Sequence, residues 1–410
     1  MAQPRIPTGF DFTAPEIYVR GIPHAEFAEM RRSAPVWWIP QERGSAGFDD
    51  DGYWAVTRHA DVMAVSRDAD TFSSWENTAI ARFQPGMPRD RIEMQRYVLL
   101  NMDPPQHTQQ RAIVSRGFTP RAINSLRAAL SSRAEQILLD AAAADGGDFV
   151  TEIACELPLQ AIAELLGVPQ EDRRNVFDWS NAMIGYDDPE YSGGADPLEP
   201  AMELLGYAMK MAEERQACPR DDIVTTLVKA EIGGEHLSTD EFGFFVLMLA
   251  VAGNETTRNA ISHGMLAMLE HPDQWELFRA GRPRTAVDEI VRWGTPVNVF
   301  QRTALRDTVL GGQEIKAGQR VALFYGSANY DEEVFDEPYR FDITRSPNPH
   351  LGFGGSGAHF CLGANLARLE IDLIFNAIAD HMPDISLAGP PERLRSGWLN
   401  SIKHLPVRYR

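Results

Sequence analysis

The sequence has 410 residues and a formal net charge of −19, from 39 Lys and Arg against 58 Asp and Glu, which argues against general binding of nucleic acids because phosphates repel negative charge. Hydrophobic residues make up 44% of the chain, enough for a sizeable core, so the composition excludes a disordered protein. Three scattered cysteines exclude a disulfide framework or a four-thiolate zinc site and favour a reducing compartment, here the cytoplasm.

The N-terminal part predicts a hairpin followed by a long loop. Residues 1–7 contain no apolar stretch and so do not form a signal peptide. Two β-type segments, 34–39 and 53–57, flank a turn rich in Gly and Asp, which favours a hairpin. The stretch 74–96 mixes Pro, Gly and charge, and we expect an irregular loop of the kind that often carries function.

The middle of the sequence is typical of helices. Residues 120–229 are rich in Ala, Leu and Glu with helical spacing of the apolar positions. A long helix is expected over about 238–270, where His271-Pro272 stops it. Its apolar run, 242–253, is too short to cross a bilayer, so we expect no transmembrane segment.

The C-terminal part predicts a helix over 284–293, a strand over 320–324, a glycine-rich loop and a last helix that begins at Cys361. No internal repeat, low-complexity tract or flexible linker divides the chain. We therefore expect a mainly α fold with a small β portion, in a single domain over residues 1–410.

The glycine-rich loop at 353–363 reads Phe-Gly-Gly-Ser-Gly-Ala-His-Phe-Cys-Leu-Gly. Its glycines allow positive φ angles and a close approach of the backbone to another group. A helix start lowers the pKa of a thiol, so Cys361 is predicted to be a thiolate ligand or a nucleophile, the alternative being a buried structural cysteine. A cysteine protease lacks support because no base or acylation motif accompanies it, and a phosphate loop lacks its Lys.

This loop resembles the haem loop of the cytochrome P450 family of haem-thiolate monooxygenases. Gly357, His359, Cys361 and Gly363 have the family's spacing, whereas Phe353 lies eight residues before the cysteine instead of seven. The resemblance implies the cytochrome P450 fold, an O2-dependent monooxygenase, and haem b held by the Cys361 thiolate.

The same resemblance implies which cationic groups bind the two haem propionates. His107 and Arg111 lie one helical turn apart and can face one anion. Arg302 and His359 match the family's other propionate partners. From the residues alone, 103–111 is better interpreted as an ordinary helix start with a surface arginine, and the family motif favours the propionate site.

Residues 252–257 place polar side chains in the middle of an otherwise apolar helix. A buried acid and hydroxyl are costly unless they are used, although this helix could also emerge into solvent at Asn254. By resemblance, Glu255 and Thr256 are the family's acid–alcohol pair and relay protons for oxygen activation, and Gly253 leaves room for the oxygen.

Glu289 and Arg292 lie three residues apart and share one face of a predicted helix. Such a pair is usually a solvated surface couple. In the family, however, an Arg from a segment like 335–342 completes a buried ionic triad with them. The resemblance therefore implies a structural triad of Glu289, Arg292 and Arg340 behind the haem loop.

Between Pro104 and Ala134 the sequence has no acidic residue, which is unusual in so acidic a chain. The arginines in this stretch are Arg111, Arg116, Arg121, Arg127 and Arg133. The pattern is either chance or a positive surface that docks an acidic electron donor. Because nothing in the chain resembles a fused flavin reductase, we expect electrons from a ferredoxin and its ferredoxin reductase.

Within the family, the stretches 155–163, 166–173, 246–259 and 392–400 look like those of actinobacterial sterol side-chain 26(27)-monooxygenases. This implies hydroxylation of the terminal side-chain methyl (C26 or C27) of cholesterol or cholest-4-en-3-one, and oxidation on to the acid, in sterol catabolism. The apolar pocket walls implied by the resemblance are Ile80, Phe83, Val251, Val297 and Trp398. The alternatives are a hydroxylase of another long apolar substrate, such as a branched lipid or terpenoid, and a haem-thiolate sensor without turnover.

Overall fold

The computed structural model describes residues 4–169, 171–192, 196, 198–220, 223–229, 231, 232 and 235–410. Residues 1–3, the start of the segment expected not to be a signal peptide, lie outside the described residues. The α-helices are α1 (Pro15–Tyr18), α2 (His24–Ser33), α3 (His59–Arg67), α4 (Arg89–Met94), α5 (Gln106–Val114), α6 (Pro120–Ser125), α7 (Arg127–Ala141), α8 (Glu156–Leu166), α9 (Arg173–Ile184), α10 (Pro189–Ser192), α11 (Leu198–Ala217), α12 (Ile223–Val228), α13 (Thr239–Glu270), α14 (Pro272–Gly281), α15 (Thr285–Gly294), α16 (Tyr325–Ala328) and α17 (Ala364–His381).

The strands are β1 (Val36–Pro40), β2 (Gly52–Val56), β3 (Phe72–Ser73), β4 (Gly146–Asp148), β5 (Glu231–Ile232), β6 (Glu235–His236), β7 (Val299–Ala304), β8 (Thr308–Leu310), β9 (Gln313–Ile315), β10 (Arg320–Phe324), β11 (Ser386–Leu387), β12 (Glu392–Arg393), β13 (Ile402–His404) and β14 (Pro406–Arg408). Short helical turns of other types are η1 (Gln95–Tyr97), η2 (Leu99–Asn101), η3 (Ser115–Phe118) and the π-helical η4 (Val150–Ala154).

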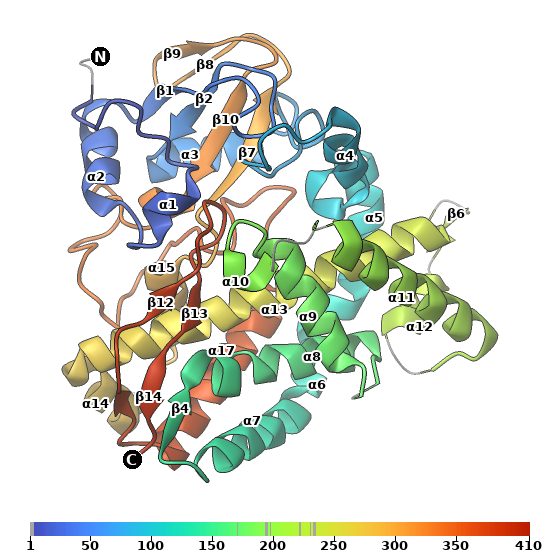
Figure 1. Cartoon of the computed structure of the whole chain (residues 1–410), viewed down its shortest axis with the longest axis vertical. Helices are drawn as coiled ribbons and strands as arrows, with labels where there is room; N and C mark the ends of the chain where they lie inside the picture. Colours follow the sequence, from blue (N-terminus) through green and yellow to red (C-terminus); the bar gives the residue numbers. More distant parts are fainter. Residues whose placement is uncertain are drawn as a thin grey trace.

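The largest sheet joins distant parts of the chain in the order β1-β2-β10-β7-β3 (Figure 1). Its hairpin, β1 with β2, is the one predicted from the two β-type segments, with Trp38 opposite Trp54. β10 runs parallel to β2 and antiparallel to β7. The sheet therefore fixes β7, which carries Arg302, against the N-terminal part of the chain.

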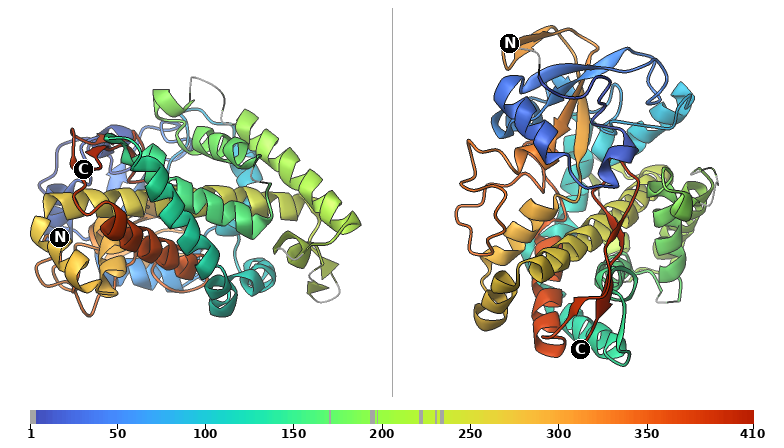
Figure 2. Two further views of the ribbon diagram at one scale, coloured as in Figure 1. Left: turned by 90° about the horizontal axis from the view of Figure 1, so that it is seen from below. Right: turned by 60° about the vertical axis from the view of Figure 1, so that its left-hand side comes forward.

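The helix α13 crosses the molecule between this sheet and α17 (Figures 1 and 2). It begins in a capping box, in which Ser238 accepts from the Glu241 amide and the Glu241 carboxylate accepts from the Ser238 amide. It ends before Pro272, which starts α14. Packing against α8, α11, α15 and α17 buries most of its apolar side chains in the main core.

Two boundaries differ from the sequence predictions. The stretch 74–96 is mostly irregular, but it contains the short helix α4. Pro88 is the N-cap of this helix, and the charged residues that follow it form the helical turns, with Ile92 buried. The last helix begins at Ala364 and not at Cys361, since Gly363 is its N-cap. Cys361 thus lies in the loop, just ahead of the helix.

The expected mainly α fold with a small β portion is confirmed. The main core contains side chains from α7, α8, α13 and α17, and smaller clusters lie around the sheet. In the part of the chain that the structure describes, none of the helices is both long and apolar enough to span a bilayer.

Candidate functional site

The cysteine loop is held against α3 by its backbone. Gly354 and Gly357 have φ angles of +96° and +86°, which favour glycine. A Cβ atom at Gly357 would lie 2.4 Å from the carbonyl oxygen of Ser66, so no larger residue fits there. The Cys361 amide donates to the Phe353 carbonyl at 2.9 Å, which closes the loop around the cysteine.

Burial dominates the electrostatics of Cys361. It raises the pKa of the thiol, although the Gly363 amide donates to the sulfur and the charges of Arg111 and Arg368 act in the opposite direction. The lowered pKa expected at a helix start is therefore wrong for the protein alone, because the helix begins three residues later and the sulfur is desolvated. A metal ion bound at the sulfur would favour the thiolate.

Within the longer stretch between Phe353 and Cys361, Ser356 is a non-glycine residue with a φ of +65°. Its hydroxyl accepts from Arg67 Nε at 2.8 Å, which anchors the loop to α3. The Phe353 ring packs against the main core, with the Arg368 guanidinium carbon 4.4 Å from its centre.

The four predicted propionate partners lie close together beside this loop. The rings of His107 and His359 are 4.3 Å apart between centroids, and the positive charge of Arg302 acts on both. Burial, together with Arg111 and Arg302, lowers the pKa of His107 to about 4, with only Asp103 opposing it. These four residues come from α5, β7 and the cysteine loop, elements that are distant in sequence.

The two arginines and two histidines of this group lack an anionic partner among the described residues. Arg302 is 4% exposed, and among the described residues it forms no ion pair; its Nη1 donates to the Gln301 carbonyl at 2.7 Å. Arg111 donates to the Phe360 carbonyl. His107 Nε2 is buried and has no hydrogen-bond partner among the described residues. Buried cations are normally paired, so this cluster fits a ligand that carries carboxylates.

The middle of α13 is only partly buried, although the helix crosses the molecule between the sheet and α17. Ala252 is exposed, and Val251 and Thr256 are half-buried. The Thr256 hydroxyl donates to the Ala252 carbonyl at 2.5 Å, one turn earlier. A Cβ atom at Gly253 would lie 2.3 Å from Ile162 Cδ1 of α8, so this glycine allows close helix packing. That it also leaves room for oxygen stays a prediction.

The structure does not bring the Glu255 carboxylate and the Thr256 hydroxyl together. Glu255 is buried and pairs with Arg258, one turn further along α13. Burial raises the pKa of Glu255, and Arg258 lowers it. The partner Arg258 was not predicted from the sequence, although its i,i+3 spacing from a buried acid is the signal that could have identified it.

The predicted pocket walls do not all belong to one hydrophobic cluster. Ile80, Phe83 and Trp398 belong to one hydrophobic cluster, although they lie in the loop after β3 and in the segment between β12 and β13. Val297 packs against a different hydrophobic cluster. It forms a β-bridge with Leu399, the residue that follows Trp398 in the sequence. Val251 is half-buried on α13 and belongs to neither of these clusters.

The predicted ionic triad needs one correction. Glu289 and Arg292 are fully buried and paired at 2.7 Å. The third cation is Arg345, whose Nε lies 3.2 Å from Glu289 Oε2. Arg340 is exposed and pairs instead with Glu337, with which it also forms a turn, since the Arg340 amide donates to the Glu337 carbonyl at 2.9 Å. The prediction of Arg340 as the third member is therefore wrong.

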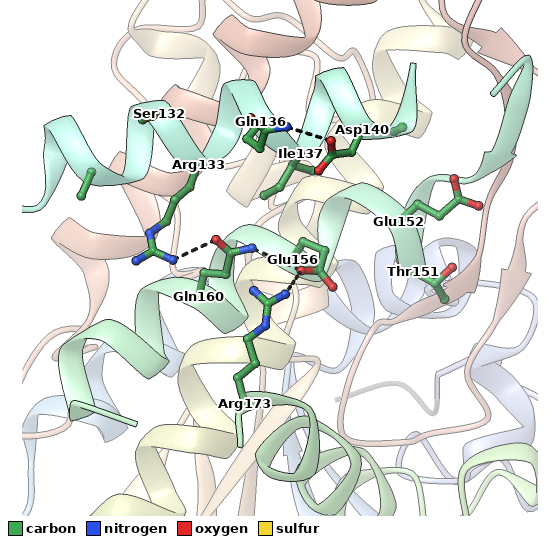
Figure 3. Close-up of a pocket in the computed structure, with 12 residues that line it drawn as sticks. Ser132, Arg133, Gln136, Ile137, Asp140, Thr151, Glu152, Glu156, Gln160 and Arg173 are labelled. Carbon is green, nitrogen blue, oxygen red and sulfur yellow. Dashed lines mark hydrogen bonds and ion pairs between the residues drawn. The ribbon is translucent and has the colours of Figure 1, made fainter. Parts of the chain in front are cut away.

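A large surface cleft, of about 770 Å³, lies elsewhere, between α7 and α8 (Figure 3). Its polar side chains already bind one another. Gln136 donates to Asp140 at 2.8 Å, and the ion pair of Arg173 with Glu156 spans 3.6 Å. The cleft therefore lacks the unpaired polar groups that mark the region around Cys361.

Glu190, Glu392 and His404 form a group with metal-ligating side chains. A cation is already there, since Lys403 Nζ lies 2.6 Å from Glu190. Both ring nitrogens of His404 also face carboxylates, those of Asp148 and Glu190. We therefore interpret the group as an ion-pair network.

The donor set around Cys361 fits a haem. The half-buried Cys361, the two arginines and two histidines without a carboxylate partner, and the unbonded His107 Nε2 lie in one region. Haem combines an iron that takes a thiolate with two carboxylates that need cationic donors. No other region of the described chain combines these features.

Comparison with known proteins identifies the family. The family model "Cytochrome P450" matches residues 284–381. The steroid C26-monooxygenase of Rhodococcus jostii is 66% identical over 410 residues, which cover 100% of this chain and 87% of that protein. The methyl-branched lipid omega-hydroxylase of Mycobacterium tuberculosis is 42% identical over 393 residues, 93% of this chain and 90% of that protein.

The fold agrees as well. A Mycobacterium marinum cytochrome P450, solved in complex with pseudoionone, superimposes with a TM-score of 0.91 at 39% identity and covers 99% of this chain and 100% of that chain. With a cysteine loop and a cationic cluster that fit haem, and with relatives over nearly the whole length, the chain belongs to the cytochrome P450 family of haem-thiolate oxidoreductases.

Proposed function

We propose that this cytochrome P450 is a monooxygenase that hydroxylates the terminal methyl group, C26 or C27, of a sterol side chain. The observation that carries the proposal is the 66% identity, over the whole chain, to a protein named steroid C26-monooxygenase. The lower identity of 42% to a methyl-branched lipid omega-hydroxylase makes that substrate class the second candidate. Cholesterol and cholest-4-en-3-one are the proposed substrates, with further oxidation to the acid.

The cofactor in this proposal is haem b, held by Cys361. When bound, it supplies the reductive activation of O2. His107, Arg111, Arg302 and His359 hold its carboxylates, and the support is their shared location and missing anionic partners. Binding in this way lets the buried Arg302 form the charge-assisted hydrogen bonds that it otherwise lacks.

The sterol side chain reaches the site through apolar groups. Ile80, Phe83 and Trp398 form a hydrophobic cluster that excludes water from an alkyl chain, and Val251 and Val297 extend it toward α13. Glu255 and Thr256 supply and position protons on the α13 side. Thr256 is the proposed donor nearest the substrate, since it lies on the less covered stretch.

The electron donor in this proposal is a ferredoxin, served by a ferredoxin reductase. Arg116 and Arg121 are exposed, in η3 and α6 next to the helix that carries Arg111. Arg127 and Arg133 are partly neutralised, by Asp372 and Glu164 respectively. The positive surface for an acidic donor is therefore centred on Arg116 and Arg121.

We further propose that residues 1–410 form one domain in a reducing compartment, the cytoplasm. One buried cluster extends from Leu99 to Tyr409, which supports a common core. The three cysteines are unpaired, as expected where thiols are kept reduced.

Product analysis tests the substrate assignment. The holoenzyme, with a ferredoxin system, is given cholest-4-en-3-one or a methyl-branched fatty acid at equal concentration, and the products are identified by mass spectrometry. We expect a terminally hydroxylated sterol to form with the higher kcat/KM. A higher kcat/KM for the branched lipid would favour the second candidate, and binding without turnover of either would favour a sensor.

A further inference from the structure

Trp398 is held in the segment that joins β12 to β13 by backbone contacts. The Asn298 amide donates to the Trp398 carbonyl at 2.8 Å, and the residue after Trp398 forms a β-bridge with Val297. A Cβ atom at Gly397 would collide with the Thr13 carbonyl oxygen, so the backbone on the other side is packed against the N-terminal part of the chain. The backbone of Trp398 is therefore fixed on both sides.

The indole nitrogen of Trp398 is buried and has no hydrogen-bond partner among the described residues. A buried tryptophan N–H usually finds an acceptor, because leaving it unpaired costs free energy. Two other tryptophans of the chain follow this rule. Trp54 Nε1 donates to Gln319 at 2.8 Å, and Trp275 Nε1 donates to the Pro383 carbonyl at 3.1 Å. The Trp398 N–H is therefore available to an acceptor from a ligand.

The surroundings of the Trp398 ring are apolar. The ring packs against the hydrophobic cluster that contains Ile80 and Phe83. Apart from Trp398, none of the proposed pocket walls has a hydrogen-bonding side chain, since Val251 and Val297 are aliphatic as well. Because the nitrogen itself is covered, a ligand oxygen reaches it when the ring or the side chains packed against it shift.

This donor lies toward the cofactor end of the proposed site. Phe300 and Arg302 are two residues apart on β7, so their side chains share one face of the sheet. The centre of the Phe300 ring is 6.2 Å from that of Trp398 and 6.2 Å from that of Tyr325, which acts electrostatically on Arg302. Since Arg302 is a proposed partner of the haem carboxylates, Trp398 meets the end of the substrate that reacts.

The reacting end of the substrate becomes polar during the reaction. A terminal methyl group has no hydrogen-bond acceptor, whereas the primary alcohol made from it has one. An alcohol oxygen without a partner in an apolar pocket costs free energy, which favours release of the alcohol. The Thr256 hydroxyl already donates to the Ala252 carbonyl, so the unused donor among the proposed site residues is the Trp398 indole.

We infer that Trp398 determines how far the substrate is oxidised: its indole N–H donates to the oxygen of the hydroxylated terminal carbon and retains the alcohol for the next oxidation. The inference rests on the proposed function, because the alcohol is the product of that reaction. The alcohol, O2, two electrons and two protons give the aldehyde and two waters. The aldehyde with the same reactants gives the acid and one water. The electrons come from the proposed ferredoxin, and the indole N–H is not consumed.

Binding of a matched pair of ligands tests this without turnover. Dissociation constants of cholest-4-en-3-one and its 26-hydroxy derivative are measured by difference spectroscopy of the holoenzyme, in wild type and in Trp398→Phe, which keeps an aromatic ring without the N–H. Loss of one hydrogen bond should raise the Kd of the alcohol about 2- to 12-fold and leave that of the ketone unchanged. Trp54→Phe removes an indole N–H outside this cluster and should change neither.

The same pair shows which oxygen of the sterol meets Trp398. A Kd that rises equally for both ligands in Trp398→Phe would place the indole N–H at the 3-oxo end of the sterol. An unchanged Kd for both would show that the N–H meets no ligand oxygen. Either result overturns the inference.

Product analysis gives the second readout. During turnover of cholest-4-en-3-one, the ratio of released alcohol to acid should rise in Trp398→Phe by about the same factor as the Kd of the alcohol, because the alcohol dissociates faster. Total consumption of the sterol should stay as in wild type. A fall in consumption with an unchanged ratio of alcohol to acid assigns Trp398 to packing alone and overturns the inference.

Two further outcomes are distinguishable. If Trp398→Phe does not fold, wild type decides, because an alcohol that binds more than about 10-fold more weakly than the ketone meets no donor in the pocket, which overturns the inference. If wild type oxidises the methyl-branched lipid and not the sterol, the proposed substrate fails. The same comparison, made with that lipid and its terminal alcohol, then decides on Trp398 by the same criteria.

Discussion

At the residue scale, the Glu289 carboxylate shows how the scaffold behind the cysteine loop is fixed. It accepts from Arg292 at 2.7 and 2.8 Å, from Arg345 at 3.2 Å and from Asn348 at 3.1 Å. It also accepts from the backbone amide of Asp342 at 2.9 Å. One buried acid therefore ties α15 to the long segment that leads from β10 to Cys361.

This predicts different effects for the two arginines after β10. Replacing Arg345 with Leu leaves Glu289 with one cation and should lower the free energy of unfolding by about 1–3 kcal/mol. Replacing Arg340 with Leu should change it by no more than about 0.5 kcal/mol, as for other exposed residues. Urea denaturation of the two variants measures both, and a larger loss at Arg340 would contradict the assignment.

Thr256 gives a second prediction at this scale. Thr256→Ala should leave sterol binding nearly unchanged and divert reducing equivalents to peroxide, because the hydroxyl on the less covered part of α13 is lost. Product formed per NAD(P)H consumed, together with sterol-induced difference spectra, measures the two effects. Full coupling with weakened sterol binding would identify Thr256 as a pocket wall instead.

At the scale of elements, the segment from the end of α9 to α10 is tied down by side chains from other parts of the chain. The Tyr186 hydroxyl donates to the Arg82 carbonyl at 3.0 Å, and Arg395 donates to the Asp187 carbonyl at 2.6 Å. His404, on β13, lies between Asp148 and Glu190, and bonds to both carboxylates require both ring N–H groups. α10 is therefore attached to β13 most firmly when His404 is protonated.

This attachment predicts a pH dependence. Burial disfavours the charged ring, but the hydrogen bonds to Asp148 and Glu190 and the charges of these carboxylates outweigh it and raise the pKa of His404. A raised pKa contributes stability that is full below the unfolded value of about 6.5 and is lost as pH rises through the folded value.

His404→Gln should therefore cost more stability at pH 6 than at pH 9, measured by urea denaturation at both values. The exposed His381, changed to Gln, is the control and should show no such difference. An equal loss for His404→Gln at both pH values would show that the ring acts by packing and not by charge.

Elements were the level most easily predicted from the sequence. The β1–β2 hairpin has a local signal in its Gly- and Asp-rich turn. The helix α13 has a capping box at its start and a proline, Pro272, after its end. No local sequence signal shows that Arg345, and not Arg340, pairs with Glu289. The two arginines are five residues apart in an irregular segment whose path depends on tertiary contacts. The turn of Glu255 toward Arg258 depends in the same way on Asn181 and the neighbouring helices.

For the whole molecule, the uneven charge distribution predicts where an electron donor binds. Reversing Arg116 and Arg121 to Glu should slow ferredoxin-driven turnover, most strongly at low ionic strength, where charges are least screened. Peroxide-driven turnover should be unaffected. Arg174→Glu, on α9, is the control for charge reversal elsewhere, and an equal loss of peroxide-driven turnover in the double variant would point to damage at the haem site instead of docking.

The central claim is that Cys361 binds haem iron as a thiolate, and the absorption spectrum of the reduced, carbon monoxide-bound protein tests it most directly. We predict the strongly red-shifted Soret band of thiolate ligation in wild type and its loss in Cys361→Ala, while Cys155→Ala retains it. The same band in Cys361→Ala, or no such band in folded wild type reconstituted with haem, would contradict the account.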